Sequence, residues 1–482
     1  MLLAVGSVLA VTSIAVAASS GPDPAKAAVV WSSVLWLISA TIVWVASGRI
    51  LWFSPIGILL ISHFAIFVAR PWFGATYQNS LNIFTQTPAT EFYLQAAIVA
   101  GTGLVSTSIG YALAFRRPSR VPPPVKPIDI HTWRRLAPLL WGIVLLGVTL
   151  YFAYILQVGW GFYWSEVFLG RSLTQKYALT ESSGYLYLGL LFANGALALI
   201  FMQAISQRSP TLAFASAGLI MLFLVPQFAA GNRSNFIPIV VALLVMLIRV
   251  FPRLITPFRA AVFIPVFIFL GFIAPRIWRN DLSQGLSFMD SILSALDPVN
   301  LFDNFVGGLD MAMIDAFSLQ VGAQASGQIP LHYGSTYVAA LSAPIPRSLW
   351  PEKPVSVDNI LNEAIFPSTH QLHIGFSFGI YSEPYLNFGI IGVILVMAVF
   401  GAVLGRVSIA LLTTTSTTVV FLVAMLTGFM FALVRGSISY DLQRFLILVL
   451  PVLTALWIEQ TVASRRTPRS TGSRLSEQPR LK

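Results

Sequence analysis

The residues best suited to chemistry in this 482-residue chain gather between positions 369 and 389. Glu383 and Asn387 are four residues apart, so they share a face of any helix that begins there, with Tyr385 between them. Glu383 is a candidate general base for activating a hydroxyl group. The alternative is a carboxylate that accepts hydrogen bonds from backbone donors at a helix start. His370 and His373 are three residues apart, but no suitable third ligand stands nearby, so they predict no metal site.

A second group of residues is cationic and stands beside turns and loops between apolar runs. Its members are Arg233, Arg276, Arg279, Arg347, Lys353, Arg435 and Arg444. The planar guanidinium offers a fork of donors that matches phosphate oxygens, so jointly these residues predict a site for a phosphate-bearing ligand. For any one of them, the alternatives are a side chain that reaches the lipid headgroups or an ion pair with a loop aspartate.

These residues must be positioned by a chain that consists mostly of apolar runs. Hydrophobic residues make up 56% of the sequence and charged residues 10%, against about 25% charged in an ordinary soluble domain. At about 20 residues for each crossing, the runs predict an all-α polytopic membrane protein with about twelve transmembrane helices. The predicted spans are 1–19, 28–47, 51–69, 94–115, 136–157, 183–204, 211–228, 235–250, 260–275, 386–408, 417–434 and 445–462. The absence of cysteine excludes disulfides, thiolate metal sites and cysteine nucleophiles.

The distribution of charge predicts how these helices are oriented. The 29 Lys and Arg residues against 18 Asp and Glu residues give a net charge of +11, which in a soluble chain would suggest a nucleic-acid partner. Alternating crossings from a cytoplasmic N-terminus place 18 of the basic residues inside, with only Asp129, Glu459 and Glu477 beside them. The positive-inside rule therefore explains the excess charge, and it predicts that both termini are cytoplasmic. We expect no nucleic-acid partner.

The predicted spans divide the chain into four parts. Residues 1–275 hold the first nine spans, with a stiff, extended, Pro/Arg-rich cytoplasmic linker at 116–135. Residues 276–385 form a large outer loop, residues 386–463 hold spans ten to twelve, and residues 464–482 form a disordered basic cytoplasmic tail. A loop of this length suggests function, and the alternative is a structural cap over the bundle. Short amphipathic helices are predicted in it by apolar residues at helical spacing: Met289, Ile292, Leu293 and Leu296, then Leu309, Met313 and Phe317.

Several functional classes are disfavoured by patterns that the sequence lacks. It has no P-loop, no dinucleotide-binding glycine fingerprint and no H-E-x-x-H motif. Ionisable residues within the predicted spans are nearly absent, which argues against a proton-coupled pump.

Three segments carry a resemblance to a known family. They are the Pro-Arg-x-x-Trp-Pro-x-Lys-Pro segment at 346–354, the Gly-Phe-Ser…Glu-Pro-Tyr-x-Asn-Phe-Gly segment at 375–389, and the Asn-Arg-Ser turn at 232–234. Together with the large late outer loop, they resemble the Wzy-type O-antigen and oligosaccharide repeat-unit polymerases of bacteria. The topology of about twelve spans extends the resemblance over nearly the whole chain.

The resemblance implies a membrane glycosyltransferase of the GT-C class, in the bacterial inner membrane, with its active site on the outer face. It implies that a polyprenyl-diphosphate-linked oligosaccharide is both donor and acceptor, that membrane lipid, a chain-length regulator and a flippase are partners, and that neither a cofactor nor a metal is needed. The outer arginines of the family match Arg233, Arg276, Arg279 and Arg347, which would bind the donor pyrophosphate, and arginine neutralises charge on the leaving group. Glu383 or His373 would assist the acceptor hydroxyl. The remaining candidates for substrate binding are Lys353, Arg435, Arg444, Tyr385 and Asn387.

Two other functions remain open. The first is an O-antigen-type ligase that moves finished glycan to a different acceptor, although the ligase branch has a His-Asn pair where this chain has Glu383-Pro384-Tyr385-Leu386-Asn387. The second is a transporter or flippase of lipid-linked glycan, which would need a polar central cavity and intramembrane charges.

Overall fold

The computed structural model describes residues 23–48, 52–77, 80–117, 122–164, 186–229, 233–254, 303–342, 350–371 and 375–466, with positions 287, 289, 290 and 293. In this part of the chain the structure consists of helices and loops, with two isolated bridges and no β-strand. The all-α polytopic class is therefore confirmed, because nine of the described helices are long and apolar enough to cross a membrane. The predicted count of twelve is not confirmed: spans 1–19 and 260–275 lie outside the described residues, and the apolar helix over 234–250 is shorter than the other nine.

The long helices follow the predicted spans closely. They are α2 (Pro24–Ser47), α3 (Pro55–His63) continued by the π-helical turn η1 (Phe64–Ala69) and α4 (Arg70–Tyr77), α5 (Glu91–Ala114), α6 (Ile130–Val158), α9 (Gly189–Ser206), α10 (Pro210–Ala229), α11 (Arg233–Val250), α20 (Ser382–Thr413), α21 (Thr417–Arg435) and α22 (Ile438–Arg466).

Polar residues immediately before the apolar runs explain where several helices begin. Asp23 accepts a hydrogen bond from the backbone N–H of Ala25, and Asp129 accepts one from Thr132. Ser54 and Ser416 cap α3 and α21 in the same way. A side-chain oxygen at this position satisfies one of the backbone donors that a helix start leaves unpaired.

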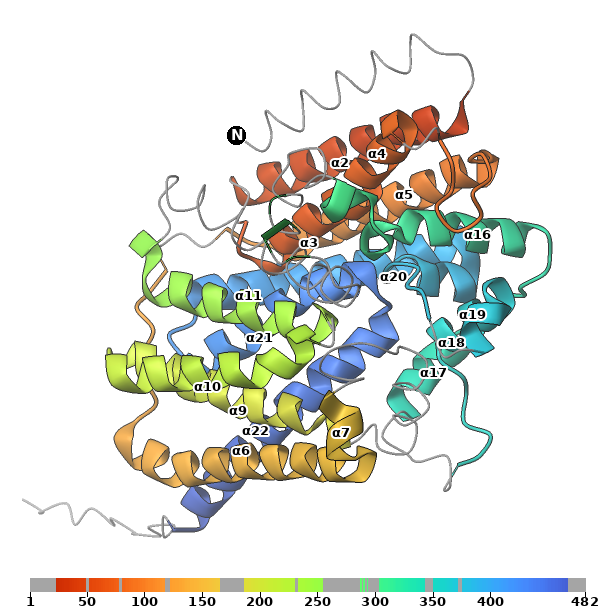
Figure 1. Cartoon of the computed structure of the whole chain (residues 1–482). Helices are drawn as coiled ribbons and strands as arrows, with labels where there is room; N and C mark the ends of the chain where they lie inside the picture. Colours follow the sequence, from red (N-terminus) through yellow and green to blue (C-terminus); the bar gives the residue numbers. More distant parts are fainter. Residues whose placement is uncertain are drawn as a thin grey trace, which may run out of the picture.

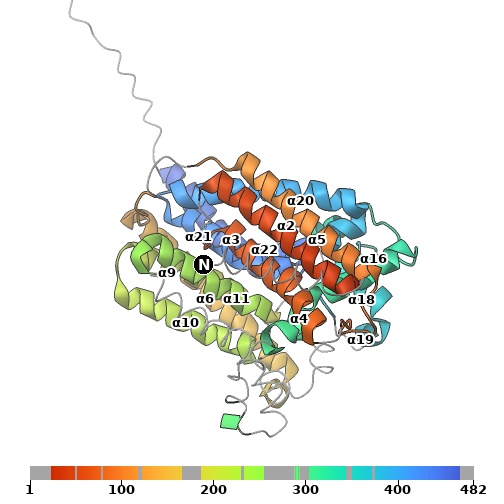
Figure 2. The same ribbon diagram turned by 90° about the horizontal axis from the view of Figure 1, so that it is seen from above.

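The helices form two groups joined by a central one, as Figures 1 and 2 show. In the first group α5 packs between α2 and α20, and in the second α9 packs against α6 and α10. In the central group α21 packs against both α11 and α22, and all three contact α9. Helix α21 also contacts α3 and α20. The buried apolar core runs through all three groups.

Glycine permits the closest of these helix contacts, between α5 and α20. A Cβ atom at Gly110 would overlap the carbonyl oxygen of Ala398, and one at Gly401 would overlap that of Thr107. Small residues at such positions let two membrane helices approach backbone to backbone. This contact lies in the middle of α20 and holds that span against the rest of the first group.

The described part of the large loop folds into short helices at one end of the bundle, which we call the α16–α19 end (Figure 1). They are η7 (Asp303–Gly307), η8 (Leu309–Met311), α16 (Met313–Ala325), α17 (Ser335–Ser342), α18 (Val357–Ile365) and α19 (Pro367–Gln371), while α7 (Trp160–Phe162) follows α6. The short helix predicted over 289–296 lies largely outside the described residues. The one predicted from Leu309, Met313 and Phe317 corresponds to η8 and α16, but α16 is not an amphipathic surface helix. Met313 and Phe317 are buried in it, and so are the polar residues Asp315 and Gln320. The reason is that α16 packs against α5 and also contacts η1, α18 and α20.

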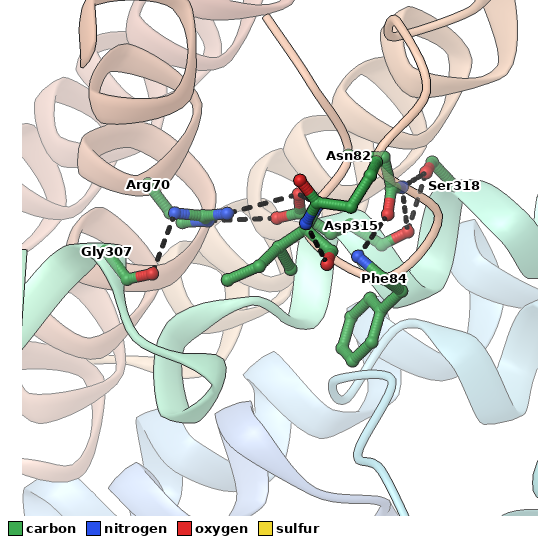
Figure 3. Close-up of polar contacts among 8 residues, drawn as sticks. Arg70, Asn82, Phe84, Gly307, Asp315 and Ser318 are labelled. Atoms are coloured by element: carbon green, nitrogen blue, oxygen red, sulfur yellow. Dashed lines mark hydrogen bonds and ion pairs between the residues drawn. The ribbon is translucent and has the colours of Figure 1, made fainter. Parts of the chain in front are cut away.

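A buried ion pair fixes α16 to the transmembrane helices (Figure 3). Arg70 Nε, at the start of α4, donates to Asp315 Oδ2 at 3.0 Å, and the two side chains are 0% and 2% exposed. Arg70 Nη1 also donates to the carbonyl oxygen of Gly307 at 3.2 Å. The loop before α5 joins this cluster, because Asn82 Nδ2 donates to the Asp315 carbonyl oxygen at 3.0 Å and to Ser318 Oγ at 3.2 Å.

Basic residues at the opposite end of the bundle bind backbone carbonyls as well as carrying charge. Arg249 donates to the carbonyl oxygens of Leu411, Pro123 and Thr414, each at 2.8 Å. Arg117 donates to the last carbonyls of α2, at Val45 and Ala46. Cations are favoured at helix C-termini, where carbonyls lack partners within the helix.

The predicted linker at 116–135 differs from the structure in extent and packing. It ends at residue 129, because α6 begins at Ile130, and its residues 118–121 lie outside the described part. The described stretch is extended and packed against the bundle. Ile128 exchanges two hydrogen bonds with the side chain of Gln203, at 2.8 and 3.0 Å, and the Lys126 N–H donates to Thr415. At the other boundary α22 continues to Arg466, three residues into the predicted tail, and residues 467–482 lie outside the described part.

Candidate functional site

The first turn of α20 is a short helical segment set apart from the span that follows. Gly389 separates them, with φ 63° and ψ −153°, a backbone conformation essentially restricted to glycine. Glu383 and Asn387 lie on one face of this turn, as their spacing predicts, and both are 0% exposed. The kink therefore decides the direction in which this pair faces relative to the rest of the helix.

Glu383 connects three elements through its carboxylate. Its Oε1 accepts a hydrogen bond from the Thr336 hydroxyl of α17 at 2.9 Å. Its Oε2 accepts one from the backbone N–H of Ser439, at the start of α22, also at 2.9 Å. Because both oxygens are occupied, this carboxylate positions α17 and α22 relative to α20, as the backbone-binding alternative describes.

Asn387 completes the same network and holds the chain that leads into α17. Its Nδ2 donates to Thr336 Oγ1 and to the Glu383 carbonyl oxygen, both at 2.8 Å, and its Oδ1 accepts from the Gly334 N–H at 2.7 Å. Gly334 has φ 92° and Tyr333 has φ 48°, so a left-handed turn places the Gly334 donor there. The Asn387 amide, the Thr336 hydroxyl and the Glu383 carboxylate thus form a continuous hydrogen-bonded chain.

The turn between α21 and α22 brings two cations and a second carboxylate to this place. Arg435 Nη2 lies 2.7 Å from Asp310 Oδ1. Arg444 Nη1 lies 3.7 Å from Asp441 Oδ1, its Nη2 donates to the Tyr440 hydroxyl at 2.6 Å, and its Cζ lies 4.1 Å from the centre of the Tyr440 ring. Gly436 leaves room in this turn for the Asp441 carboxylate, which a Cβ atom at this position would overlap.

A third carboxylate approaches from α18. Asp358 Oδ2 accepts a hydrogen bond from the Ser437 hydroxyl at 3.1 Å. Desolvation of the carboxyl group, with the nearby carboxylates of Asp441 and Glu383, raises the pKa of Asp358 from 3.8 to about 7. Acidic groups so close together resist simultaneous ionisation, so this cluster can exchange a proton near neutral pH.

Two polar atoms at this place are buried and have no hydrogen-bond partner within the described residues. They are the Arg435 Nε and the Tyr337 hydroxyl. Burial and the Glu383 carboxylate raise the pKa of Tyr337, so its hydroxyl stays protonated and remains a donor. Buried polar groups in native proteins are almost always paired with protein or water, so these two unpaired donors mark a place for a polar ligand or water.

Two other predicted site residues, Tyr385 and Lys353, are not brought into this cluster. Tyr385 points from a different side of the turn and meets the Phe317 ring edge-on, with ring centres 5.7 Å apart. Lys353 Nζ donates to the carbonyl oxygen of Ser342 at 3.5 Å, at the end of α17. Arg276, Arg279, Arg347 and His373 lie outside the described residues, as does the side chain of Arg233, the first residue of α11.

Comparison with known protein families decides what kind of protein carries this arrangement. Residues 28–465 match the family of the O-antigen polysaccharide polymerase Wzy. The chain belongs to the Wzy family. The match overlaps all nine candidate membrane spans, so the protein is a membrane enzyme, a glycosyltransferase-like polymerase of O-antigen. Comparisons with curated proteins and with solved structures give no match.

The cluster also contains residues of this Wzy-family chain that sequence reasoning did not single out as site residues. They are Thr336, Tyr337, Asp358, Ser437, Ser439 and Asp441. Asp441 gave the clearest signal, because it stands between Arg435 and Arg444 and three residues before the latter. Thr336 and Tyr337 stand more than forty residues before Glu383, and Ser437 and Ser439 stand more than fifty residues after it. Asp358 stands at the start of α18, and only the fold brings these residues together.

The chemistry of the cluster is that of anion and hydroxyl binding. Guanidinium groups, hydroxyls and backbone N–H groups supply donors, and carboxylates supply acceptors. In the part of the chain that the structure describes, no group of three or more His, Asp or Glu side chains is arranged to hold a metal ion.

Proposed function

We propose that the protein transfers a glycan from a polyprenyl-diphosphate carrier to the end of another lipid-linked repeat unit. The observation that carries this proposal is the convergence, within a Wzy-family chain, of Glu383 and Asn387 with Arg435 and Arg444 at the starts and ends of α20, α21 and α22. Hydroxyl-activating and phosphate-binding groups then stand in one place, as a transfer from a diphosphate carrier requires.

We place this cluster on the outer face of the bacterial inner membrane. Crossings that alternate from a cytoplasmic N-terminus put the α16–α19 end outside, and they put both termini in the cytoplasm. Basic residues such as Arg117 and Arg249 lie at the opposite end, which supports the same orientation. The lipid carrier would then reach the site from the outer leaflet.

The transfer replaces one bond at the anomeric carbon with another. The acceptor hydroxyl oxygen attacks the anomeric carbon of the donor glycan, the bond from that carbon to the phosphate oxygen breaks, and polyprenyl diphosphate leaves with the electron pair. The proton of the acceptor hydroxyl passes to a base. Charge grows on the departing diphosphate, and preorganised guanidinium donors stabilise it without the need for a metal ion.

In this proposal Arg435 donates its unpaired Nε–H to the diphosphate, together with Arg233, Arg276, Arg279 and Arg347. Arg444 holds Asp441 and the α22 start in place beside them. Glu383 or His373 takes the proton.

Substitution of the two candidate bases separates their roles. If Glu383 is the base, Glu383→Gln should lower the turnover number by about 10²–10⁴-fold, and His373→Gln should lower it much less. If His373 is the base, the two effects should be reversed. The measurement is glycan elongation by purified protein supplied with polyprenyl-diphosphate oligosaccharide.

A triple variant tests the diphosphate site. It combines Arg276→Ala, Arg279→Ala and Arg347→Ala, and unchanged elongation by it would contradict the assignment of these arginines.

Elongation should persist in excess EDTA, and its loss would contradict the metal-free mechanism.

The same assay separates the rival functions. A ligase would move glycan to a different acceptor and would not extend single repeat units into longer chains. A flippase would move lipid-linked glycan across the membrane and form no new glycosidic bond.

A further inference from the structure

A pocket lies at the α16–α19 end, apart from the Glu383 cluster. It has a volume of about 550 Å³ and lies between the loop at 82–90, the start of α5, α16 and the end of α18. Sites for small ligands commonly have volumes of about 300–1,000 Å³, so this pocket is large enough to enclose one.

The lining of this pocket is uncharged. No Asp, Glu, Lys, Arg or His side chain contributes to it. Hydroxyl and amide groups stand around it, among them Thr85, Thr87, Ser326 and Gln328, and the Phe92 ring forms part of its wall. Such a lining does not suit a diphosphate, which would need cationic donors. It suits a neutral ligand with many hydroxyl groups and an apolar face.

The Phe92 ring lies directly against α16. A Cβ atom at Gly322 would lie 3.0 Å from Phe92 Cδ2, so the glycine leaves room for the ring to lie against the helix. Ser318, Gly322 and Ser326 follow one another at four-residue spacing, and all three line the pocket. This face of α16 therefore presents small and hydroxyl-bearing residues beside an aromatic ring.

The opposite face of α16 is tied to the candidate active site. Gln320 Nε2 donates to the Ser382 carbonyl oxygen at 2.9 Å, and Gln324 Nε2 donates to that of Tyr385 at 3.5 Å. Both acceptors belong to the first turn of α20, which carries Glu383. One helix thus forms a wall of the pocket and also holds the turn that bears the proposed base.

Helix α18 joins the two places in a second way. Asp358, at its start, bonds to Ser437 in the Glu383 cluster, and Ile365 and Phe366, at its end, line the pocket. At 1.5 Å for each residue, the helix separates them by roughly 12 Å. An extended oligosaccharide has a length of this order, so one chain can reach from the cluster to the pocket.

We propose that this pocket binds an uncharged saccharide segment of the glycan, away from the bond that is made. The C–H face of a sugar ring packs on the Phe92 ring, whose π-face carries negative charge density. The hydroxyls of the sugar exchange hydrogen bonds with Thr85, Thr87, Ser326 and Gln328. The assignment of the ligand as part of the substrate rests on the proposed function, whereas binding of a neutral saccharide does not.

Direct binding tests the proposal with the full-length protein in lipid nanodiscs. The probe is the single repeat-unit oligosaccharide, released from its carrier and diphosphate by mild acid, and the readouts are calorimetry and saturation-transfer NMR. Ser326→Trp places a large side chain at the exposed rim and should abolish binding. Ser368→Trp makes the same change at an exposed serine outside the lining and should leave the affinity unchanged.

A second pair of variants tests the aromatic wall. Phe92→Ala should weaken binding by about tenfold, and Phe92→Tyr should restore it, because the ring face is kept. Equal binding of the oligosaccharide by the wild type and Ser326→Trp, or no binding by the folded wild type, would overturn the proposal.

Elongation assays on the same samples separate this inference from the proposed function. The Ser326→Trp protein should still join the first two repeat units, but it should yield shorter chains than the wild type. If the wild type binds the free saccharide in the pocket but forms no glycosidic bond, the proposed function fails and the binding site stands. If the wild type elongates chains and the Ser326→Trp protein binds the saccharide with wild-type affinity, the pocket assignment fails and the proposed function stands.

Discussion

The backbone N–H of Ser439 donates a hydrogen bond to Glu383 Oε2 at 2.9 Å and so joins the first turns of α20 and α22. The other oxygen of the same carboxylate accepts from Thr336 of α17. A single buried side chain therefore fixes the relative positions of two membrane-spanning helices and a loop helix. Any role of Glu383 in proton transfer must operate from within this network.

Removal of the Thr336 hydroxyl should weaken this network without changing its shape. Thr336→Val is nearly isosteric, and it leaves Glu383 Oε1 buried without its donor, at a cost of about 1–3 kcal/mol in the free energy of unfolding. We expect a lower Tm and a lower rate of glycan elongation. Thr336→Ser keeps the hydroxyl and should retain most of both. Equal Tm values for Thr336→Val and the wild type would show that the hydrogen bond contributes nothing.

The kink at Gly389 should be essential to the direction of the Glu383–Asn387 pair. Gly389→Ala meets no atom within 4 Å, so its cost is conformational alone, about 1–3 kcal/mol for φ 63° and ψ −153°. We expect a reduced rate of elongation with protein still folded in detergent. Gly142→Ala is the matched control, since Gly142 also has open space around it and lies inside the regular helix α6. That control should be neutral or slightly stabilising, and equal effects of the two variants would contradict the kink's role.

The raised pKa of Asp358 predicts a pH dependence of stability. Its pKa is about 7 in the folded protein and 3.8 ordinarily, so the folded state binds the proton more tightly than the unfolded state. The stabilisation from this group is complete below about pH 4 and is lost as the pH rises through about 7. We therefore expect the Tm to fall between pH 5 and pH 8, measured by thermal unfolding in nanodiscs.

Substitution should show whether Asp358 causes that fall. Asp358 faces Glu383 from α20 and Asp441 and Arg444 from α22. Asp358→Asn removes the titrating group and keeps an acceptor for Ser437, so its Tm should depend less on pH and exceed that of the wild type at pH 8. Glu363→Gln changes an exposed carboxylate of the same helix and should leave the wild-type pH profile intact. A profile of Asp358→Asn that parallels the wild type would rule out this residue as the cause.

The Arg70–Asp315 pair should be costly to break from one side (Figure 3). Arg70→Met leaves the Asp315 carboxylate buried without its cation, which costs about 3–5 kcal/mol. Asp315 Oδ1 also accepts a hydrogen bond from the Ile83 N–H. The substitution Asp315→Asn removes the negative charge and keeps an oxygen that can accept this bond. The double variant should therefore recover much of the Tm that Arg70→Met loses. Additive losses in the double variant would mean that the two residues act independently.

The helical architecture was largely predictable because membrane crossing imposes a strong local pattern. Runs of about 20 apolar residues bounded by Asp23, Ser54, Asp129 or Ser416 leave little choice about where helices begin. The extent of the linker was less predictable. Its prolines indicate an extended chain, but its packing depends on Gln203 and Thr415, which are distant in sequence.

The candidate site was predictable only where its residues share one turn. The four-residue spacing of Glu383 and Asn387 placed them together, because helical periodicity acts locally. Tyr385 stands between them in the sequence, so the same periodicity places it on another side of the turn, where its ring packs against Phe317. Thr336 and Asp358 could not be assigned, since a hydroxyl and a carboxyl in a long loop gain a role only through the tertiary contacts that bury them.

The most direct measurement of the central claim is the order in which labelled repeat units enter the product. Purified protein in nanodiscs receives polyprenyl-diphosphate-linked single repeat units as its only substrate, first unlabelled and then isotopically labelled. If the growing chain is transferred from its carrier to each new lipid-linked unit, the products form a ladder spaced by one repeat, with the label next to the carrier. Products of one size, label at the far end of the chain, or no new glycosidic bond would contradict the account.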